Sequence, residues 1–181
     1  MSAPAFTAQL YRATPSQEHP AGCAELDYED RFLRRKVLTL KDGRTVLADL
    51  PKTTSLDHGG VLVTTTGEEI AIAAASQPLL AVTGTDMVRI AWHIGNRHTP
   101  CQIEAERLLI QHDHVIRDML IRIGATVAEV HEPFTPEGGA YGMGRTHGHD
   151  HSHSHGPDSH SHDHGHSHDH THDQSHDHDH H

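Results

Sequence analysis

The segment from Leu79 to Val130 reads LLAVTGTDMVRIAWHIGNRHTPCQIEAERLLIQHDHVIRDMLIRIGATVAEV, and it decides the fold of the second half of the chain. Two apolar runs in it recur at the spacing of an amphipathic helix and end at Gly95 and Gly124. Thr85 can cap the first helix, with an acid following in its first turn, and Asp113 can cap the second. The residues expected on the buried helix faces are Met87, Val88, Ile90, Ala91 and Ile94, and then Val115, Ile116, Met119, Leu120 and Ile123.

Four short apolar stretches with strand character surround these two helices. They are Leu79–Val82, Cys101–Ile103, Leu108–Ile110 and Thr126–Val130. The resulting order is strand, helix, strand, strand, helix, strand, which is the split βαβ or ferredoxin-like arrangement. We therefore predict an α+β protein with a ferredoxin-like domain over residues 77–136.

The first half of the chain has the turn signals of a small β domain. Asp42-Gly43 lies between Leu38–Leu40 and Thr45–Leu47, and a type I′ hairpin turn needs positive φ at both central residues. A second hairpin is predicted around residues 66–68, between apolar stretches at 60–63 and 70–72. Residues 1–76 are therefore predicted to form a β-rich N-terminal domain.

The last part of the chain has a different composition. Between His147 and His181 lie 16 of the 23 histidines and seven aspartates, without a lysine, arginine, aromatic or aliphatic side chain. Such a segment cannot bury a core, so we expect residues 137–181 to form a Gly-rich connector and a disordered tail.

Charge and hydropathy exclude several classes of protein. Residues 1–146 carry 14 basic and 18 acidic side chains, a formal charge of −4, whereas the whole chain carries −11. An acidic tail and a body without a basic stripe argue against a nucleic-acid binder. No apolar run approaches the roughly 20 residues of a membrane span, and no secretory signal is recognisable. The widely separated Cys23 and Cys101 fit reduced thiols, and we expect a cytoplasmic protein without membrane association.

The histidine-rich tail predicts metal binding. Its imidazoles recur mostly every second residue, and neutral imidazole suits nickel, copper, zinc and cobalt better than magnesium or calcium. A purification tag is usually a plain run of six histidines, and a purely solvating tail would not need imidazole. The tail residues that we assign as metal ligands are His147, His149, His151, His153 and His155.

The body contains a second set of histidines. His98 follows the glycine that ends the first helix, so it lies on a surface connection, where a single histidine is usually not a ligand. His112 and His114 flank the predicted cap of the second helix, whose positive end repels a cation. Their site should therefore be weak, and an ordinary polar helix start is the alternative. His93 has helical spacing with apolar residues, so a packing or surface role is favoured.

Four segments of the chain resemble the UreE family of urease accessory proteins, which are nickel metallochaperones. They are KDGR at 41–44, WHIGNRHTPCQI at 92–103, DHV at 113–115 with DML at 118–120, and PFTPEGGAY at 133–141. The GNRH motif at 95–98 is the most specific of them. A histidine-rich tail behind the fourth segment strengthens the resemblance.

The resemblance implies a β-rich domain similar to a peptide-binding module, joined to a ferredoxin-like domain that dimerises. It implies that His98 meets its twin across a two-fold axis and that the pair binds one Ni(II) ion, with His112 and His114 as peripheral ligands. The implied partners are the urease GTPase UreG and the complex of apo-urease with its accessory proteins. Cys101 replaces a common aliphatic residue and is left out of the site. A metal-driven tetramer stays open, and Zn(II) and Cu(II) are expected to bind in vitro.

Two other classes of function are weighed against a metallochaperone. A cytoplasmic nickel, zinc or copper buffer would share the tail but would need no delivery partner. A metalloenzyme is disfavoured because the sequence has no HExxH motif, no CxxC pair and no histidine–carboxylate set beside a general base. We therefore predict a metal carrier and not an enzyme.

Overall fold

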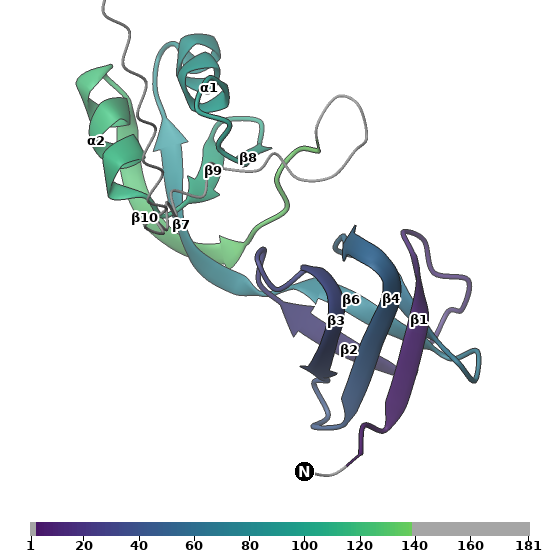
Figure 1. Cartoon of the computed structure of the whole chain (residues 1–181). Coiled ribbons are helices and arrows are strands. Elements are labelled where there is room, and N and C mark those ends of the chain that lie inside the picture. Colours follow the sequence, from purple (N-terminus) through teal and green to yellow (C-terminus); the bar gives the residue numbers. More distant parts are fainter. Residues whose placement is uncertain (1–2, 139–181) are drawn as a thin grey trace, which may run out of the picture. The chain divides into compact units, whose positions relative to one another are not determined.

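The computed structural model describes residues 3–138, which form two β-sheets and two helices (Figure 1). The six-stranded sheet has the order β2-β6-β5-β1-β4-β3, and the four-stranded sheet has the order β10-β7-β9-β8. The strands of the first sheet are β1 (Phe6–Arg12), β2 (Gly22–Leu26), β3 (Phe32–Thr39), β4 (Thr45–Ser55), β5 (Val61–Thr64) and β6 (Glu69–Ala74). The second sheet and the two helices that lie between its strands in sequence are formed by β7 (Ser76–Thr83), α1 (Met87–Gly95), β8 (Cys101–Ile103), β9 (Leu108–Gln111), α2 (His114–Arg122) and β10 (Thr126–Pro133).

Both predicted hairpins of the N-terminal sheet are confirmed. β3 pairs with β4 and β5 pairs with β6, each antiparallel. The prediction of a type I′ turn is wrong, however. That turn needs positive φ at both central residues, and only Gly43 (φ 85°) has it, whereas Asp42 does not. The Asp42 carboxylate instead accepts the backbone N–H of Arg44 at 3.0 Å, an Asx turn that holds the loop by a side chain.

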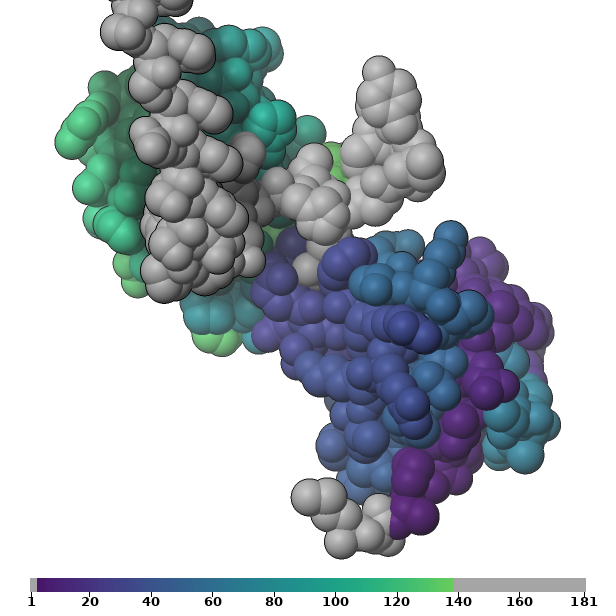
Figure 2. All heavy atoms as spheres, in the orientation of Figure 1, coloured from purple at the N-terminus to yellow at the C-terminus, as the bar shows by residue number. Residues whose placement is uncertain are grey.

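The sequence patterns did not predict β1 and β2. Both strands make parallel pairs, β1 with β4 and β2 with β6, while β1 also pairs antiparallel with β5. The two edges of the sheet meet where the N–H of Lys41 donates to the carbonyl of Cys23 at 2.9 Å. β1, β4 and β3 form the face nearest the viewer in the space-filling view (Figure 2). Inside lies a core that includes Leu38, Leu62 and Ile70, each 2 % exposed or less.

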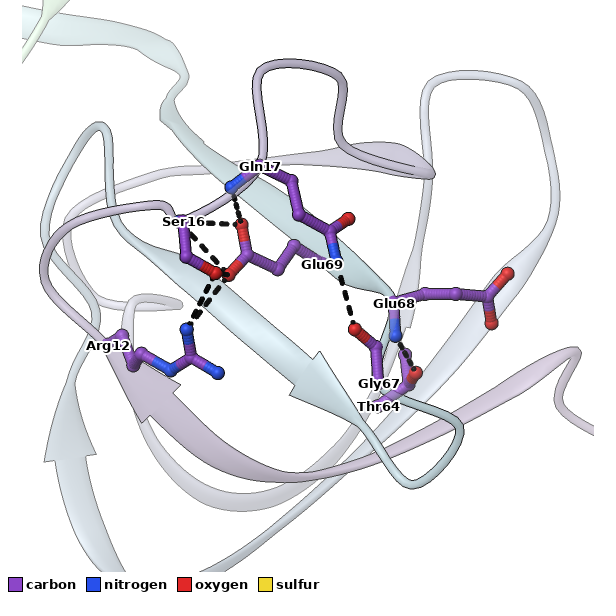
Figure 3. A network of polar contacts seen from close by, with 7 residues as sticks. All are labelled: Arg12, Ser16, Gln17, Thr64, Gly67, Glu68 and Glu69. Carbon is purple, nitrogen blue, oxygen red and sulfur yellow. Dashed lines mark hydrogen bonds and ion pairs between the residues drawn. The ribbon is translucent and has the colours of Figure 1, made fainter.

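A buried carboxylate anchors the loop between β1 and β2. The side chain of Glu69 is 1 % exposed and accepts hydrogen bonds from the backbone N–H groups of Ser16 and Gln17 and from the Ser16 hydroxyl (Figure 3). Arg12 adds an ion pair at 3.2 Å. A buried charge is tolerated when it is paired and hydrogen-bonded in this way.

The C-terminal sheet has the predicted element order of strand, helix, strand, strand, helix, strand. All its strand pairs are antiparallel, and β10 aligns with β7 over eight residues, from Thr126↔Thr83 to Pro133↔Ser76. Both helices pack on one face of the sheet, because residues from α1, α2, β7 and β9 share a single core. The fully buried members of that core include Leu80, Ile94 and Leu120.

Two residues predicted to be on the buried helix faces are exposed. Val88 on α1 is 83 % exposed and Val115 on α2 is 62 % exposed, so both assignments are wrong. Each lies at the margin of the apolar stripe, and helical periodicity cannot distinguish the margin of a stripe from its centre. The remaining predicted positions are buried or packed against the core.

A small cluster lies on the other face of the C-terminal sheet. Tyr28 and Phe134 pack edge to face with ring centroids 5.3 Å apart, next to Leu79 and Leu109. The guanidinium of Arg31, 4 % exposed, donates to the carbonyl of Phe134. The predicted connector and tail, except for residues 137 and 138, lie outside the described residues.

Candidate metal centre

The end of helix α1 positions His98. Asp86, one residue after the predicted cap, begins the helix by accepting the N–H of Arg89 at 3.0 Å. After the helix ends, the N–H of His98 donates to the carbonyl of Gly95 at 2.9 Å. The second of these bonds holds the backbone of His98 in a tight turn, where its side chain is exposed, as the sequence predicted for a surface connection.

The backbone of His98 is strained. Its φ is 55°, and it is the single non-glycine residue within 3–138 with a positive φ. The left-handed conformation costs an L-residue roughly 1–2 kcal/mol. Strain of this kind concentrates at functional positions, so it points to His98 independently of any sequence motif.

The residues before His98 form a partly apolar surface. Trp92 is 63 % exposed and lies one helical turn after Val88, so the two side chains share one side of α1. The indole of Trp92 contacts the ring of His93 edge to face. His93 is half-buried, and its carbonyl accepts a hydrogen bond from Arg97 at 3.1 Å, which agrees with the predicted packing or surface role.

The thiol of Cys101 has the properties of a packed, un-ionised group. Burial, and then the charge of Glu137, raises the pKa of Cys101 to about 11. Its side chain packs against the core of the C-terminal sheet, and its carbonyl accepts the N–H of Glu137 at 2.9 Å. Metals bind the thiolate form, so this environment supports leaving Cys101 out of the site.

His112 and His114 lie on either side of Asp113, which caps α2. The Asp113 carboxylate accepts the N–H groups of Val115 and Ile116 at 2.8 and 2.9 Å, as predicted. His112 precedes this cap, and its Nε2 lies 3.5 Å from Oε1 of Glu129 on β10. Sequence reasoning missed Glu129, because only the packing of α2 beside β10 brings the two side chains together (Figure 1).

The described part of the chain does not assemble the predicted ligands into one site. Within residues 3–138, no three His, Cys, Asp or Glu side chains are grouped so that they could hold a metal ion. His98 and the His112–Glu129 pair therefore stand as separate groups of at most two ligands. The predicted tail ligands His147, His149, His151, His153 and His155 lie outside the described residues.

The described helices include none that could cross a membrane. The two helices of residues 3–138, α1 and α2, have nine residues each. A membrane-spanning helix needs about 20 residues.

Comparison with known proteins gives the same family for both halves of the chain. Residues 9–75 match the family model "UreE urease accessory protein, N-terminal domain", and residues 77–181 match "UreE urease accessory protein, C-terminal domain". The chain is 63 % identical over 147 residues to a protein named urease accessory protein UreE from Ruegeria sp. (strain TM1040), covering 81 % of this chain and 84 % of that protein.

Two further relatives carry the same name. The one from Ruegeria pomeroyi is 64 % identical over 123 residues, covering 68 % of this chain and 83 % of the relative. The one from Cereibacter sphaeroides is 54 % identical over 128 residues, covering 71 % and 70 %. The chain therefore belongs to the UreE family of urease accessory proteins, which gives it a role in urease maturation.

Proposed function

We propose that this protein is a nickel metallochaperone that binds Ni(II) at a site built around His98 and delivers it to apo-urease. The single observation that carries the proposal is the exposed imidazole of His98, held at φ 55° in the turn after α1. A turn that only had to end a helix would be less strained with glycine at this position. The strain is explained if the imidazole is needed there.

Two copies of the chain would convert one histidine into a pair. A two-fold interface places the same residue on both sides of its axis, so a His98 near the axis meets its twin. The exposed apolar pair Val88 and Trp92 lies on the helix that leads to His98 and supports an interface there. We therefore propose a homodimer whose paired His98 side chains bind one nickel ion.

The few protein ligands of such a site suit a carrier. A two-histidine site leaves coordination positions open, so an acceptor can add its own ligand before the donor releases the ion. We propose that the tail histidines, from His147 onward, raise the local concentration of metal, as tethered ligands do. Zn(II) and Cu(II) should also bind in vitro, since copper lies above nickel in the Irving–Williams order.

We propose that the acceptors are the urease GTPase UreG and the complex of apo-urease with its accessory proteins, and that the protein acts without catalysis in the cytoplasm.

We also infer a ferredoxin-like domain over residues 77–136, which the order β10-β7-β9-β8 supports. Residues 1–76 would form the β-rich domain and residues 137–181 the connector and tail.

The delivery function is tested in cells whose urease activation depends on this chain at limiting nickel. The full-length His98→Ala variant should lower both the nickel content and the activity of urease. His19→Ala is the matched control, because His19 is also exposed but lies in the loop between β1 and β2. Equal urease nickel content for the parent and for His98→Ala would show that His98 is not the delivery site.

The interface is tested by sedimentation of the purified full-length protein. Val88→Asp places a charge on the exposed side of α1 and should shift a dimer towards monomer without lowering the thermal stability of the subunit. Thr39→Asp is a control at an exposed position on β3. If Val88→Asp sediments as the parent does, the interface lies elsewhere.

A pull-down that recovers no urease component would favour a metal buffer over a chaperone.

A further inference from the structure

After β10 the chain crosses the C-terminal sheet to its opposite edge (Figure 1). The strand order β10-β7-β9-β8 makes β10 and β8 the two edges of this sheet. Phe134, the first residue after β10, is fully buried in a cluster with residues of β7 and β9 on the face opposite the helices. Three residues later, the N–H of Glu137 donates to the carbonyl of Cys101 on β8 at 2.9 Å. Residues 134–137 therefore form a strap across the sheet.

The side chain of Gln102 on β8 holds the middle of this strap. Its Oε1 accepts the backbone N–H of Thr135 at 2.6 Å and the Thr135 hydroxyl at 3.3 Å. Its Nε2 donates to the carboxylate of Glu104 at 2.8 Å, so both ends of the amide have partners that fix its orientation. Glu104 is in turn held by Arg107, whose guanidinium also pairs with Glu132 of β10. The strap is thus fastened to β8 by a side chain that is itself held in place.

The strap ends close to His98. Cys101 follows His98 by three residues, a chain distance of at most about 11 Å. Because Glu137 is bonded to Cys101, the chain that continues from Gly138 into the histidine-rich segment leaves the sheet beside the turn of His98. Without the strap it would leave from β10, which lies three strand spacings, or about 14 Å, from β8. The strap decides at which edge of the C-terminal sheet the tail begins.

We propose that Gln102 is a positioning residue, which holds the strap against β8 and so places the start of the metal-binding tail beside His98. The consequence for metal binding rests on the proposed function of His98 and the tail, whereas the course of the strap requires no metal. The alternative is a role restricted to the stability of the sheet. In that case the replacement of Gln102 would leave the distance between the start of the tail and His98 unchanged.

The size of the effect follows from the length of the tether. His147, the first histidine of the tail, is ten residues after Glu137 and thirteen after Phe134. Phe134 stays packed when the bonds of Gln102 are lost, so release of the strap lengthens the tether from ten to thirteen residues. The effective concentration of a tethered group falls with about the −3/2 power of the length of a Gly-rich tether, and the start of the tether also moves away from β8. The tail histidines should therefore reach His98 at about half the effective concentration.

The position of the strap is tested with a nitroxide spin label on the full-length protein. The label is attached to Gly138→Cys, at the exposed end of the strap, in a Cys23→Ser background. Cys101 reacts slowly, because burial raises its pKa to about 11. A nitroxide broadens the NMR signals of nearby amides, and the broadening falls steeply with distance. The amide signals of residues 96–98 should therefore be broadened.

Gln102→Ala should largely remove this broadening. The matched control is Gln111→Ala, at a half-buried glutamine on β9 whose amide contacts Glu29, and it should leave the broadening as it is. Thr135→Pro removes the donor of the same hydrogen bond from the exposed strap and should act as Gln102→Ala does, so the test does not depend on the folding of one variant. Equal broadening in the parent and in both strap variants would overturn the proposal, and so would an absence of broadening in the parent.

The consequence for metal binding is tested by a zinc titration of the unlabelled full-length protein, followed by NMR of the His98 ring. The His98 midpoint should move to about twofold higher zinc in Gln102→Ala and should stay unchanged in Gln111→Ala. An unchanged midpoint in Gln102→Ala would show that Gln102 does not act on metal binding. A His98 ring that fails to respond in the parent would count against the proposed function of His98, while the broadening experiment, which uses no metal, still decides the position of the strap.

Discussion

The indole ring of Trp92 meets the imidazole ring of His93 edge to face, with ring centroids 5.0 Å apart and planes at 81°. Trp92 is the only tryptophan of the chain, and the carbonyl of Trp92 accepts the N–H of Asn96 in the turn that leads to His98. The fluorescence of the whole protein therefore reports on the end of α1. A metal ion bound at His98 would lie within a few residues of the fluorophore.

Saturation with Cu(II), a strong quencher, should lower Trp92 emission in the full-length protein. His98→Ala should retain clearly more emission at saturation than the parent, because the ion nearest the indole is lost. Tail sites are present in both proteins and cancel in the comparison. His19→Ala should quench as the parent does, and equal quenching of His98→Ala and the parent would place the quenching ion elsewhere.

The left-handed backbone of His98 predicts an unusual order of stability. His98→Gly should be more stable than His98→Ala by about 1 kcal/mol, because only glycine adopts positive φ without steric cost. For the domain proposed over residues 77–136, that difference corresponds to a melting temperature about 4–8 °C higher. Calorimetry of both metal-free variants measures it. An alanine variant more stable than the glycine variant would show that position 98 is not held in the left-handed region.

Glu69 predicts a specific loss of stability in acid. Hydrogen bonds from the Ser16 hydroxyl, together with those from the backbone of residues 16 and 17, hold the pKa of Glu69 below its ordinary value despite burial. Because the folded pKa is depressed, the stabilisation is complete above the unfolded pKa of about 4.3 and is lost as the pH falls through the folded value.

Glu69→Gln should therefore lower the melting temperature at pH 7, where the parent carboxylate is charged. The difference between Glu69→Gln and the parent should shrink as the pH is lowered below about 4. Melting curves at several pH values measure both effects. Glu18→Gln, at an exposed position in the same loop, is the control and should follow the parent throughout. A difference that stays constant with pH would mean that the Glu69 charge does not contribute to stability.

Cys101 predicts slow thiol chemistry. With a pKa of about 11, roughly one Cys101 thiol in a thousand is ionised at pH 8, and the thiolate is the form that iodoacetamide alkylates. The pKa of Cys23 is also raised by burial, but the charge of Lys41 opposes that shift. Mass spectrometry of partly alkylated full-length protein should find Cys23 modified first. Faster labelling of Cys101 would contradict its packed environment.

Local signals predicted much of the fold. The two hairpins of the first half and both helices depend on residues close together in sequence, such as Asp42 with Gly43 and Asp113 with Gly124. β1 and β2 depend on partners far away, since Phe6 aligns with Val46 and Gly22 with Ile70. When the register of a strand is set by a distant parallel partner, the hydropathy pattern of the strand's own residues gives little indication of the pairing.

The candidate site was predictable to a similar degree. The position of His98 after a helix stop follows from Gly95, but its positive φ does not, because even histidine, which adopts positive φ more often than most non-glycine residues, does so in only a small fraction of cases. The exposure of Val88 could not be foreseen, since an apolar residue at helical spacing reads the same in a core as on an open surface. Glu129 required the packing of α2 beside β10.

The parallel pairing of β2 with β6 also has a consequence for synthesis on the ribosome. Gly22 cannot meet Ile70 until about 50 further residues have been translated, which takes roughly 3–10 s at 5–20 residues per second. The β3–β4 hairpin forms in microseconds and is ready long before, whereas β5 can pair with β6 only once β6 itself has been translated. The N-terminal sheet of the nascent chain thus closes in one late step, and until then β2 waits without its partner strand, as a segment on which a ribosome-bound chaperone can act.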